Sequence, residues 1–294
     1  MTIDPYRIFT GHKAMIFALS DIPGTSSFLS GSADGALVVW DIATGDGRLL
    51  ARLDEPILTI VPDSSDVSII WVGTLEGHLH KINIHSGEFR KIKLIKGGIL
   101  SIVLQDKNIF ISGDEGLIIA LDKETLKIET SIVVSHKRCR ALIPQDDKLI
   151  AGTNEGRLIQ LSPQNLNIIK QSEYVHNKPL LHLCLLQDII YATSLDGKIL
   201  LYDHELHLIK DIAAHSSAVY DICPIAGDTM LASASRDKTI RLWQPDSMHL
   251  LKTIDRFYHE GHYRSVNALL WLAPENLLIS GGDDMSIRAW KFIN

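Results

Sequence analysis

The stretch Ala232–Trp243, reading ASASRDKTIRLW, decides how the rest of the chain is interpreted. Two short runs within or beside it, Met230–Ser235 and Thr239–Trp243, carry β-favouring or alternating apolar residues, as strands do. Between the two runs the charged residues Arg236–Lys238 form a tight polar turn. The stretch therefore predicts a β-hairpin.

The hairpin belongs to a pattern of four residues that occurs three times. From His to Ser to Asp to Trp the spacings are 18, 4 and 6 residues in every case. Three identical spacings of four chemically distinct residues do not arise by chance, so the pattern indicates a repeat protein. The three sets are His12, Ser30, Asp34 and Trp40, then His215, Ser233, Asp237 and Trp243, then His262, Ser280, Asp284 and Trp290.

Seven units of similar length fill the chain when each is anchored on the acidic residue of its hairpin turn. Successive anchors lie 42, 39, 40, 41, 41 and 47 residues apart, and Gly follows the acid in five units, as a turn with positive φ favours. A period of about 40–45 residues is that of a four-stranded propeller blade, so we expect an all-β, seven-bladed propeller. The anchors are Asp34, Glu76, Glu115, Glu155, Asp196, Asp237 and Asp284.

The expected domain is a single propeller over residues 1–294 whose seventh unit lacks a fourth strand. The strand-like run Tyr6–Phe9 lies just before the first unit, where a fourth strand stands in the other units. We expect this run to pair onto the last blade, because pairing removes an open sheet edge and closes the ring. The alternative is an open array with a frayed N-terminus. The expected blades are 12–54, 55–95, 96–134, 135–174, 175–212, 213–256, and 257–294 together with 5–10.

Composition and charge exclude several classes of protein. The chain is 46% hydrophobic and 22% charged, so it can bury a sizeable core. A net charge of −6 argues against wholesale binding to nucleic acid or to an anionic membrane. No apolar run approaches the roughly 18 residues of a membrane span, and the N-terminus has no apolar region of a secretory signal. Three distant cysteines in apolar strand patterns indicate reduced thiols and a cytoplasmic location.

Patterns typical of catalysis or metal binding are sparse. His, Ser and Asp also make up hydrolytic triads, but a catalytic serine would not recur three times beside a Trp at one spacing. Two close histidine pairs, His78 with His80 and His204 with His207, have no third ligand nearby in sequence, so we expect surface histidines. GxGxxG, P-loop and HExxH patterns are absent. The sequence predicts no catalytic residue, no metal site and no cofactor.

These motifs resemble the repeats of the WD40 family. The resemblance rests on the Gly-His or Ala-His pairs at 11–12, 214–215 and 261–262 and on the Trp that ends each hairpin, whereas units two to five are degenerate. It implies that each complete set forms a buried hydrogen-bonded tetrad, with about 0.5–1.5 kcal/mol contributed by each bond. It also implies a non-enzymatic scaffold that binds a protein or peptide partner on its narrow top face.

The resemblance further implies which residues contact the partner. Members of the family often use the third and fifth residues after the repeat histidine and the residue before the turn Asp. Carried over to this chain, these positions combine aromatic, aliphatic and Arg side chains, a composition close to that of interaction hot spots. For the Leu residues at these positions, and for Leu75 and Leu195, contact with a partner and filling of the central channel are equally favoured alternatives. The expected contacts are Met15, Phe17, Leu58, Leu100, Arg138, Arg140, Leu181, Tyr220, Arg236, Asn267 and Asp283.

Two other functions stay open. A propeller enzyme would need a convergent acid, base or metal set at the mouth of the channel, where the sequence places mainly apolar residues. An RNA-binding propeller would use Lys137, Arg138 and Arg140 with Tyr220 or Phe17 for stacking. A steep loss of affinity with salt would separate RNA binding from peptide binding.

The long interval before the seventh anchor adds one more candidate contact. Its extra residues lie around Asp255–Glu260, just before the last Gly-His pair. Phe257 and Tyr258 on such a loop either contact a partner or pack against the loop itself.

Overall fold

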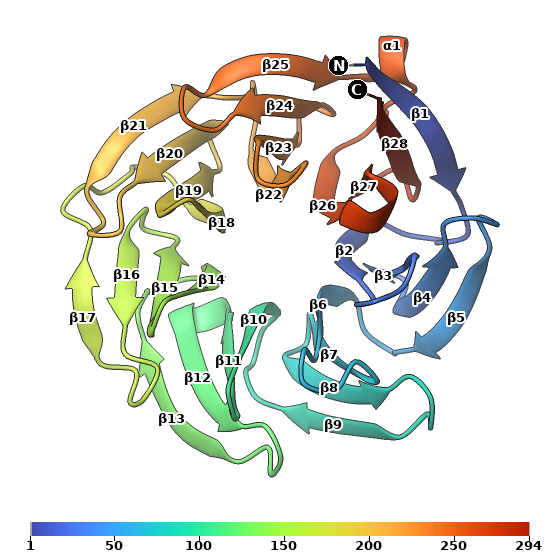
Figure 1. Cartoon of the computed structure of the whole chain (residues 1–294). Coiled ribbons are helices and arrows are strands. Elements are labelled where there is room, and N and C mark those ends of the chain that lie inside the picture. Colours follow the sequence, from blue (N-terminus) through green and yellow to red (C-terminus); the bar gives the residue numbers. More distant parts are fainter. Residues whose placement is uncertain (1, 294) are drawn as a thin grey trace.

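Seven antiparallel sheets of four strands stand around a central channel in the computed structural model, which describes residues 2–293 (Figure 1). The sheets follow one another round the ring in chain order, and each runs from an inner strand at the channel to an outer strand at the rim. The fold is therefore the all-β, seven-bladed propeller that the repeat spacing predicts. Met1 and Asn294, the ends of the expected domain, lie outside the described residues.

The first four blades are built as follows. Blade one contains β2 (Ile16–Asp21), β3 (Ser27–Ser32), β4 (Ala36–Asp41) and β5 (Gly47–Arg52). Blade two contains β6 (Ile57–Pro62), β7 (Ile69–Thr74), β8 (His78–Asn83) and β9 (Phe89–Lys93). Blade three contains β10 (Ile99–Gln105), β11 (Asn108–Gly113), β12 (Leu117–Asp122) and β13 (Ile128–Val133). Blade four contains β14 (Cys139–Gln145), β15 (Lys148–Thr153), β16 (Leu158–Leu161) and β17 (Ile168–Gln171).

The last three blades complete the ring. Blade five contains β18 (Leu180–Leu186), β19 (Ile189–Ser194), β20 (Lys198–Tyr202) and β21 (Leu208–Ala213). Blade six contains β22 (Val219–Ile225), β23 (Met230–Ser235), β24 (Ile240–Gln244) and β25 (His249–Ile254). Blade seven contains β26 (Val266–Leu272), β27 (Leu277–Gly282), β28 (Ile287–Ile293) and the N-terminal strand β1 (Thr2–Phe9).

The N-terminal strand closes the ring as predicted. β1 runs antiparallel to β28, from the pair Thr2 and Ile293 to the pair Phe9 and Ile287. It begins four residues before the expected start at Tyr6, because Ile3 is buried in the cluster between blades six and seven. Pro5, which has no backbone N–H, stands at a bulge of this outermost strand, a place where sheets tolerate proline.

The hairpin turns explain why glycine follows the acidic anchor so often. The residue after the anchor has positive φ in all seven units, including 74° at Gly35 and 87° at Gly197. In units six and seven the same position is occupied by Lys238, with φ of 74°, and Met285, with φ of 63°. The turn therefore imposes a left-handed residue on every blade, whichever side chain the sequence supplies.

The hydrophobic core lies between neighbouring blades. Each cluster of buried apolar side chains draws on two adjacent sheets, as where Ile57 of blade two packs with Leu29 and Leu37 of blade one. Backbones approach closely at these contacts, because a Cβ at Gly73 of blade two would lie 2.6 Å from Ile99 of blade three. A blade thus buries its faces only when its neighbours are present, which makes the closed ring one cooperative unit.

Within residues 2–293, short helical turns interrupt the strands in three places where the sequence predicts none. These are the helix α1 (Arg256–His259) and single 3-10 turns at Asp114–Gly116 and Ala273–Glu275. The α1 turn lies in the long connection between blades six and seven, where Asp255 accepts hydrogen bonds from the backbone N–H groups of Phe257 and Tyr258, each at 2.9 Å. Among the described residues, helices never reach the length and apolarity needed to cross a membrane.

Candidate functional site

Each of the seven inner strands contains a β-bulge at the same position. The pairing register shifts across one residue, for example between Ile16 and Ala18 in β2 and between Val219 and Asp221 in β22. A bulge leaves its extra residue unpaired and re-aims that side chain. The seven bulge residues, which we call the bulge ring, all line the central cavity. They are Phe17, Leu58, Leu100, Arg140, Leu181, Tyr220 and Asn267.

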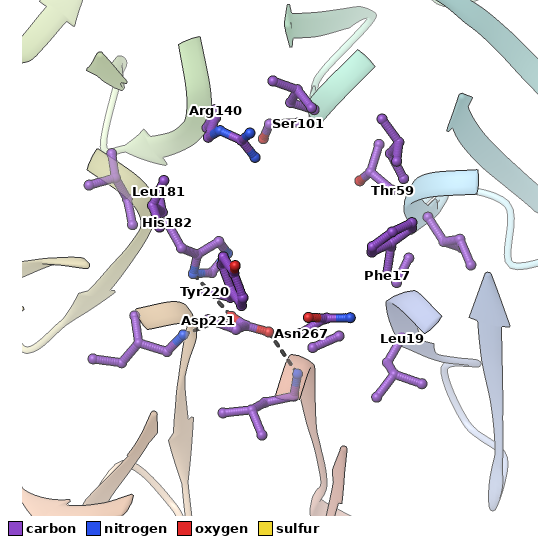
Figure 2. Close-up of a pocket in the computed structure, with 18 of the residues that line it drawn as sticks. Phe17, Leu19, Thr59, Ser101, Arg140, Leu181, His182, Tyr220, Asp221 and Asn267 are labelled. Carbon is purple, nitrogen blue, oxygen red and sulfur yellow. Dashed lines mark hydrogen bonds and ion pairs between the residues drawn. The ribbon is translucent and has the colours of Figure 1, made fainter. Parts of the chain in front are cut away.

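The central cavity has a volume of about 870 Å³, within the range of small-ligand and peptide-anchor pockets (Figure 2). Ten of the eleven residues expected to contact a partner line it, and the bulge ring supplies seven of these ten. The other three, Met15, Arg138 and Asp283, lie nearer the turns that form the top rim. Their role in binding stays a prediction, but the structure brings them to one place.

Arg236 is the expected contact that the cavity does not include. Its backbone N–H donates to the carbonyl of Ala218 at 2.9 Å, which places it in the same turn position as Asp283 of blade seven. Its side chain is exposed and does not line the cavity. Arg236 therefore lies on the rim of blade six, outside the site that the other ten residues form.

The expected Leu residues differ in their exposure and in their place in the cavity. Leu58, Leu100 and Leu181 belong to the channel wall, and Leu181 is only 8% exposed. Leu75 lines the cavity yet is 46% exposed, whereas Leu195 is 44% exposed and lies outside the cavity. The first three side chains line the wall of an open cavity, the last two are exposed, and contact of any of them with a partner stays a prediction.

A polar pair interrupts the wall of the cavity, whose lining is otherwise mainly apolar, as the sequence predicts. His182 of blade five places Nδ1 3.1 Å from Oδ1 of Asp221 in blade six. The other oxygen of Asp221 accepts from the backbone N–H of Leu269 at 2.7 Å, so this carboxylate joins blades five, six and seven (Figure 2). Each of the two residues follows a bulge residue by one position, and a polar side chain inside the apolar runs LLHLCLL and VYDICPI was the available signal.

The other two carboxylates of the cavity also have partners. Asp114 pairs with Nε of Arg138 at 2.5 Å and accepts from the backbone N–H of Gly98 at 2.9 Å. Asp283 accepts from Nδ2 of Asn267 at 2.7 Å. Every carboxylate that lines the cavity is thus already bound to a donor within residues 2–293.

Arg140 differs from these residues because its guanidinium forms no hydrogen bond or ion pair with any other residue that the structure describes. It comes from the bulge of β14 and points into the open space of the cavity (Figure 2). Burial and the neighbouring charge of Arg138 lower its pKa from the ordinary value, but a guanidinium stays protonated in proteins. Within residues 2–293, the site therefore contains a cation that has no direct ion-pair or hydrogen-bond partner.

Two thiols in the wall of the cavity are unreactive near neutral pH. Cys184 and Cys223 line the cavity, and burial raises the pKa of Cys184 to about 12 and that of Cys223 in the same direction. A thiol that stays protonated near neutral pH is a poor nucleophile. All three cysteines of the chain, including Cys139, are free thiols.

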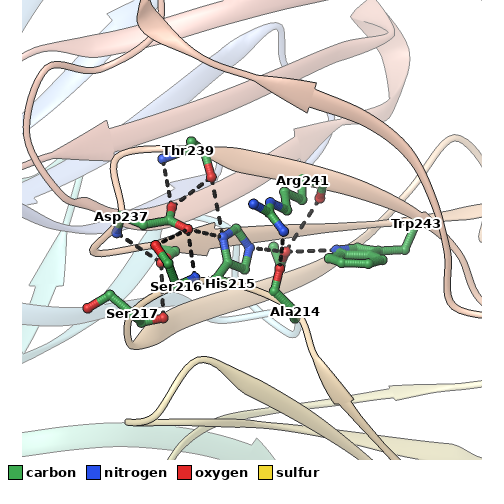
Figure 3. A network of polar contacts seen from close by, with 10 residues as sticks. Ala214, His215, Ser216, Ser217, Asp237, Thr239, Arg241 and Trp243 are labelled. Atoms are coloured by element: carbon green, nitrogen blue, oxygen red, sulfur yellow. Dashed lines mark hydrogen bonds and ion pairs between the residues drawn. The ribbon is translucent and has the colours of Figure 1, made fainter.

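The tetrads of blades one and six show three hydrogen bonds each. In blade six, His215 lies 3.0 Å from Asp237 and 2.7 Å from Ser233, and Trp243 donates to Ser233 at 2.8 Å (Figure 3). Because burial lowers the pKa of His215, its ring is neutral: Nδ1 donates to the carboxylate and Nε2 accepts from the hydroxyl. Blade one repeats the arrangement at 3.4, 2.6 and 2.7 Å.

The prediction that Trp290 completes a third tetrad is wrong. His262 does bond to Asp284 at 2.8 Å and to Ser280 at 2.7 Å. However, the indole N–H of Trp290 donates to the backbone carbonyl of His259 at 3.0 Å. The α1 insertion supplies this carbonyl, so the extra residues before blade seven redirect the tryptophan.

The degenerate blades hold other polar groups at the corresponding places. His176 lies 3.1 Å from Asp196 in blade five, a pair that the spacing rule missed because it spans 20 residues in place of 22. In blade two, Glu55 accepts from Lys91 at 2.7 Å and contacts His78 at 2.8 Å.

The expectation of surface histidines fails at His80. Its side chain is 1% exposed, and its two ring nitrogens have no hydrogen-bond partner among residues 2–293. Burial lowers its pKa to about 4, so the ring is neutral near pH 7. His78, by contrast, is half-buried and bonded to the Glu55 carboxylate.

Removing the carboxylate of a complete tetrad is expected to cost more than removing its counterpart in a degenerate blade. Asp237→Ala leaves His215 without its acceptor in a buried site and should lower the free energy of unfolding by about 1–3 kcal/mol. Glu155→Ala removes bonds from the side chain of Ser135 and the backbone of His136 in a more exposed turn, so its cost should be smaller. Urea unfolding of the two variants measures the difference, and equal losses would contradict it.

Comparisons with known proteins agree with this architecture. The family described as WD domain, G-beta repeat matches residues 3–41, 206–244 and 251–291. The ubiquitin homeostasis protein lub1 of Schizosaccharomyces pombe is 36% identical over 84 residues, which are 29% of this chain and 11% of lub1. Actin-interacting protein 1 of Caenorhabditis elegans is 21% identical over 303 residues, 99% of this chain and 48% of that protein. The aligned regions thus span between about a tenth and about half of the length of these relatives.

A solved structure shows the same fold along the whole chain. The WD40 β-propeller domain of Doa1 superposes with a TM-score of 0.85, covering 100% of this chain and 98% of that domain at 16% identity. The first family match, residues 3–41, begins in β1 and ends in β4, so the family repeat itself spans the joint at which the ring closes. The chain is therefore a seven-bladed β-propeller that carries WD40 repeats at the three stretches matched by the family model.

Proposed function

We propose that this propeller is a non-enzymatic scaffold that binds a peptide or loop of a partner protein at the mouth of the channel on the narrow top face. The observation that carries the proposal is the bulge ring, since all seven blades turn one side chain out of the ladder and toward the same cavity. A ring built this way is preformed, so a peptide that binds there loses its own freedom while the protein loses little.

The chemistry of the ring supports a protein partner. Phe17 and Tyr220 offer rigid aromatic area, and Arg140 offers several donors, the residue types that dominate interaction hot spots. WD40 propellers are generally non-catalytic, and one of the relatives, actin-interacting protein 1, is named for binding a protein. We also propose a cytoplasmic location, where the three free thiols would stay reduced.

The His182–Asp221 pair is the observation that favours an enzyme instead. A base of this kind acts on a nucleophile within hydrogen-bond reach. The ring of His182 contacts Asp221 and no hydroxyl or thiol among residues 2–293, and the nearby cysteines keep their protons. The pair has a structural role, because it joins blade five to blade six, and this role explains its presence without catalysis. We therefore favour the scaffold.

The test is affinity capture from a native lysate with the wild-type protein and with a Phe17→Ala, Tyr220→Ala double variant. We expect the variant to lose the main partner while its melting curve stays nearly unchanged, because both side chains line an open cavity. Retention of the partner by the double variant would place the binding surface elsewhere. Capture that depends steeply on salt and disappears with ribonuclease would indicate RNA in place of a peptide.

Matched controls come from the outer strands. Arg48→Glu and Ile169→Ala change exposed residues of β5 and β17, far from the channel in the ring (Figure 1). These variants should keep the partner. Lys123 is unsuitable as a control, because its ammonium bonds to the buried Asp63 at 3.1 Å.

A further inference from the structure

We infer that the channel recognises a carboxylate of the bound peptide, and that Arg140 is the residue that binds it. The inference rests on the proposed function and names the chemistry of the ligand. The reason is that two of the three basic side chains in the cavity have a carboxylate partner there and the third does not. Its cationic or basic side chains are Arg138, Arg140 and His182, and Asp114 and Asp221 already engage the first and the last of these.

Arg140 is left without a partner, and the carboxylates of the cavity are not free to supply one. Both oxygens of Asp114 are used, one by Arg138 and one by the backbone of Gly98. Both oxygens of Asp221 are used as well. Asp283 accepts from Asn267 in blade seven, whereas Arg140 stands in blade four, across the ring (Figure 1).

The setting of Arg140 strengthens its attraction for an anion. The side chain is half-buried in a cavity, where an ion pair is screened less than on an open surface. Burial and the nearby Arg138 both disfavour its charge, and an anion from the ligand relieves both effects. Figure 2 shows the guanidinium directed into the space that Tyr220 and Phe17 also face, so a peptide lying across these aromatics brings its side chains within reach.

A carboxylate fits this site better than a phosphate. One guanidinium presents two parallel N–H donors, which match the two oxygens of a carboxylate. A phosphate carries close to two negative charges and three acceptor oxygens, so its sites usually gather several cations. The carboxylate can come from an Asp or Glu side chain or from the C-terminus of the partner, and the experiment separates these sources.

The experiment uses arrays of random peptides with one fixed central residue: Glu, Gln, Lys or phosphoserine. A second set without acidic residues carries either a free or an amidated C-terminus. The whole protein is applied as wild type, Arg140→Met and Arg48→Met, the last of which changes an exposed arginine of β5 at the rim. We expect the wild type to prefer Glu over Gln, or a free over an amidated C-terminus, by roughly tenfold, as a hydrogen-bonded charge pair provides. Arg140→Met should lose this preference, and Arg48→Met should keep it.

Each other outcome overturns the inference. Peptide binding without a carboxylate preference, or a preference that survives in Arg140→Met, would refute the role of Arg140 and leave the proposed function standing. Stronger binding of phosphoserine than of Glu would refute the carboxylate. Failure to retain any peptide would refute the proposed function too. Melting curves establish that the variants fold, and Arg140→Gln replaces Arg140→Met if the latter does not.

Discussion

Deleting residues 1–10 is expected to open the ring and leave a protein that aggregates or melts many degrees lower. The deletion removes β1, which pairs with β28 from Thr2 to Phe9. It also removes Ile3 and Phe9, which are 4% and 2% exposed, and each such side chain contributes about 1.5–3 kcal/mol on burial. With the ladder included, the loss is a large part of the roughly 5–15 kcal/mol that stabilises a folded domain.

Size-exclusion chromatography and thermal melts measure this effect. Tyr6→Ala and Ile8→Ala serve as controls, because these side chains of β1 are 40% and 44% exposed and their loss keeps the pairing. A synthetic peptide of residues 2–9, added in excess, should raise the melting temperature of the truncated protein by mass action. An unchanged melting temperature and solubility after the deletion would refute closure by β1.

The ring and its closure could be predicted because their signals are periodic. Four residues that must meet in space keep fixed spacings, as His12, Ser30, Asp34 and Trp40 do. The last unit lacks a fourth strand, and this gap likewise indicated that a strand from the N-terminal end of the chain completes the blade. The first residue of that strand could not be predicted, since its start depends on the burial of Ile3 between two blades that lie far away in sequence.

Contacts between different blades are not marked by a fixed spacing in the sequence. His182 and Asp221 belong to different repeats, so no spacing rule relates them. Trp290 shows a second reason: an indole N–H takes the acceptor that its surroundings provide, and the length of an insertion does not reveal where the carbonyl of His259 will lie. Local pattern therefore predicted what lies within a blade and missed what joins blades.

The candidate site was predictable to the extent that it repeats. Counting five residues from the histidine reaches Phe17, Tyr220 and Asn267, all of which stand at bulges. The position before the turn acid was less reliable, because Asp283 lines the cavity and Arg236 does not, although their backbones make the same hydrogen bond. Equivalent backbone positions place the first atoms of two side chains alike. The length of each side chain and its neighbours then decide whether its end group reaches the cavity.

Asp63→Ala is expected to lower the free energy of unfolding by about 3 kcal/mol near pH 7, because it breaks a buried junction between blades two and three. The Asp63 carboxylate is 3% exposed, accepts from Ser65 at 2.6 Å and from the Trp71 indole at 3.2 Å, and pairs with Lys123 at 3.1 Å. The substitution leaves the ammonium of Lys123, whose side chain is 12% exposed, without its counter-ion, and it leaves the indole without its acceptor. Replacing Lys123 by Met in the same protein should recover part of the loss, since an apolar side chain tolerates that setting.

The same junction makes stability depend on pH. Burial would raise the pKa of Asp63, but hydrogen bonds from Ser65, Trp71 and Lys123 outweigh it and lower the pKa to about 2. A folded-state pKa below the unfolded value of 3.8 means that the contribution is fully present above pH 4 and is lost as the pH falls toward 2. Urea unfolding at pH 7 and at pH 3 should therefore show a smaller difference in the free energy of unfolding between wild type and Asp63→Ala at the lower pH.

Asp66→Ala provides the control for both pH values. Its exposed carboxylate bonds within its own loop to Ser68, so its removal should cost little stability at either pH. Equal losses for the two substitutions at pH 7 would show that the junction with Lys123 contributes nothing to holding the blades together.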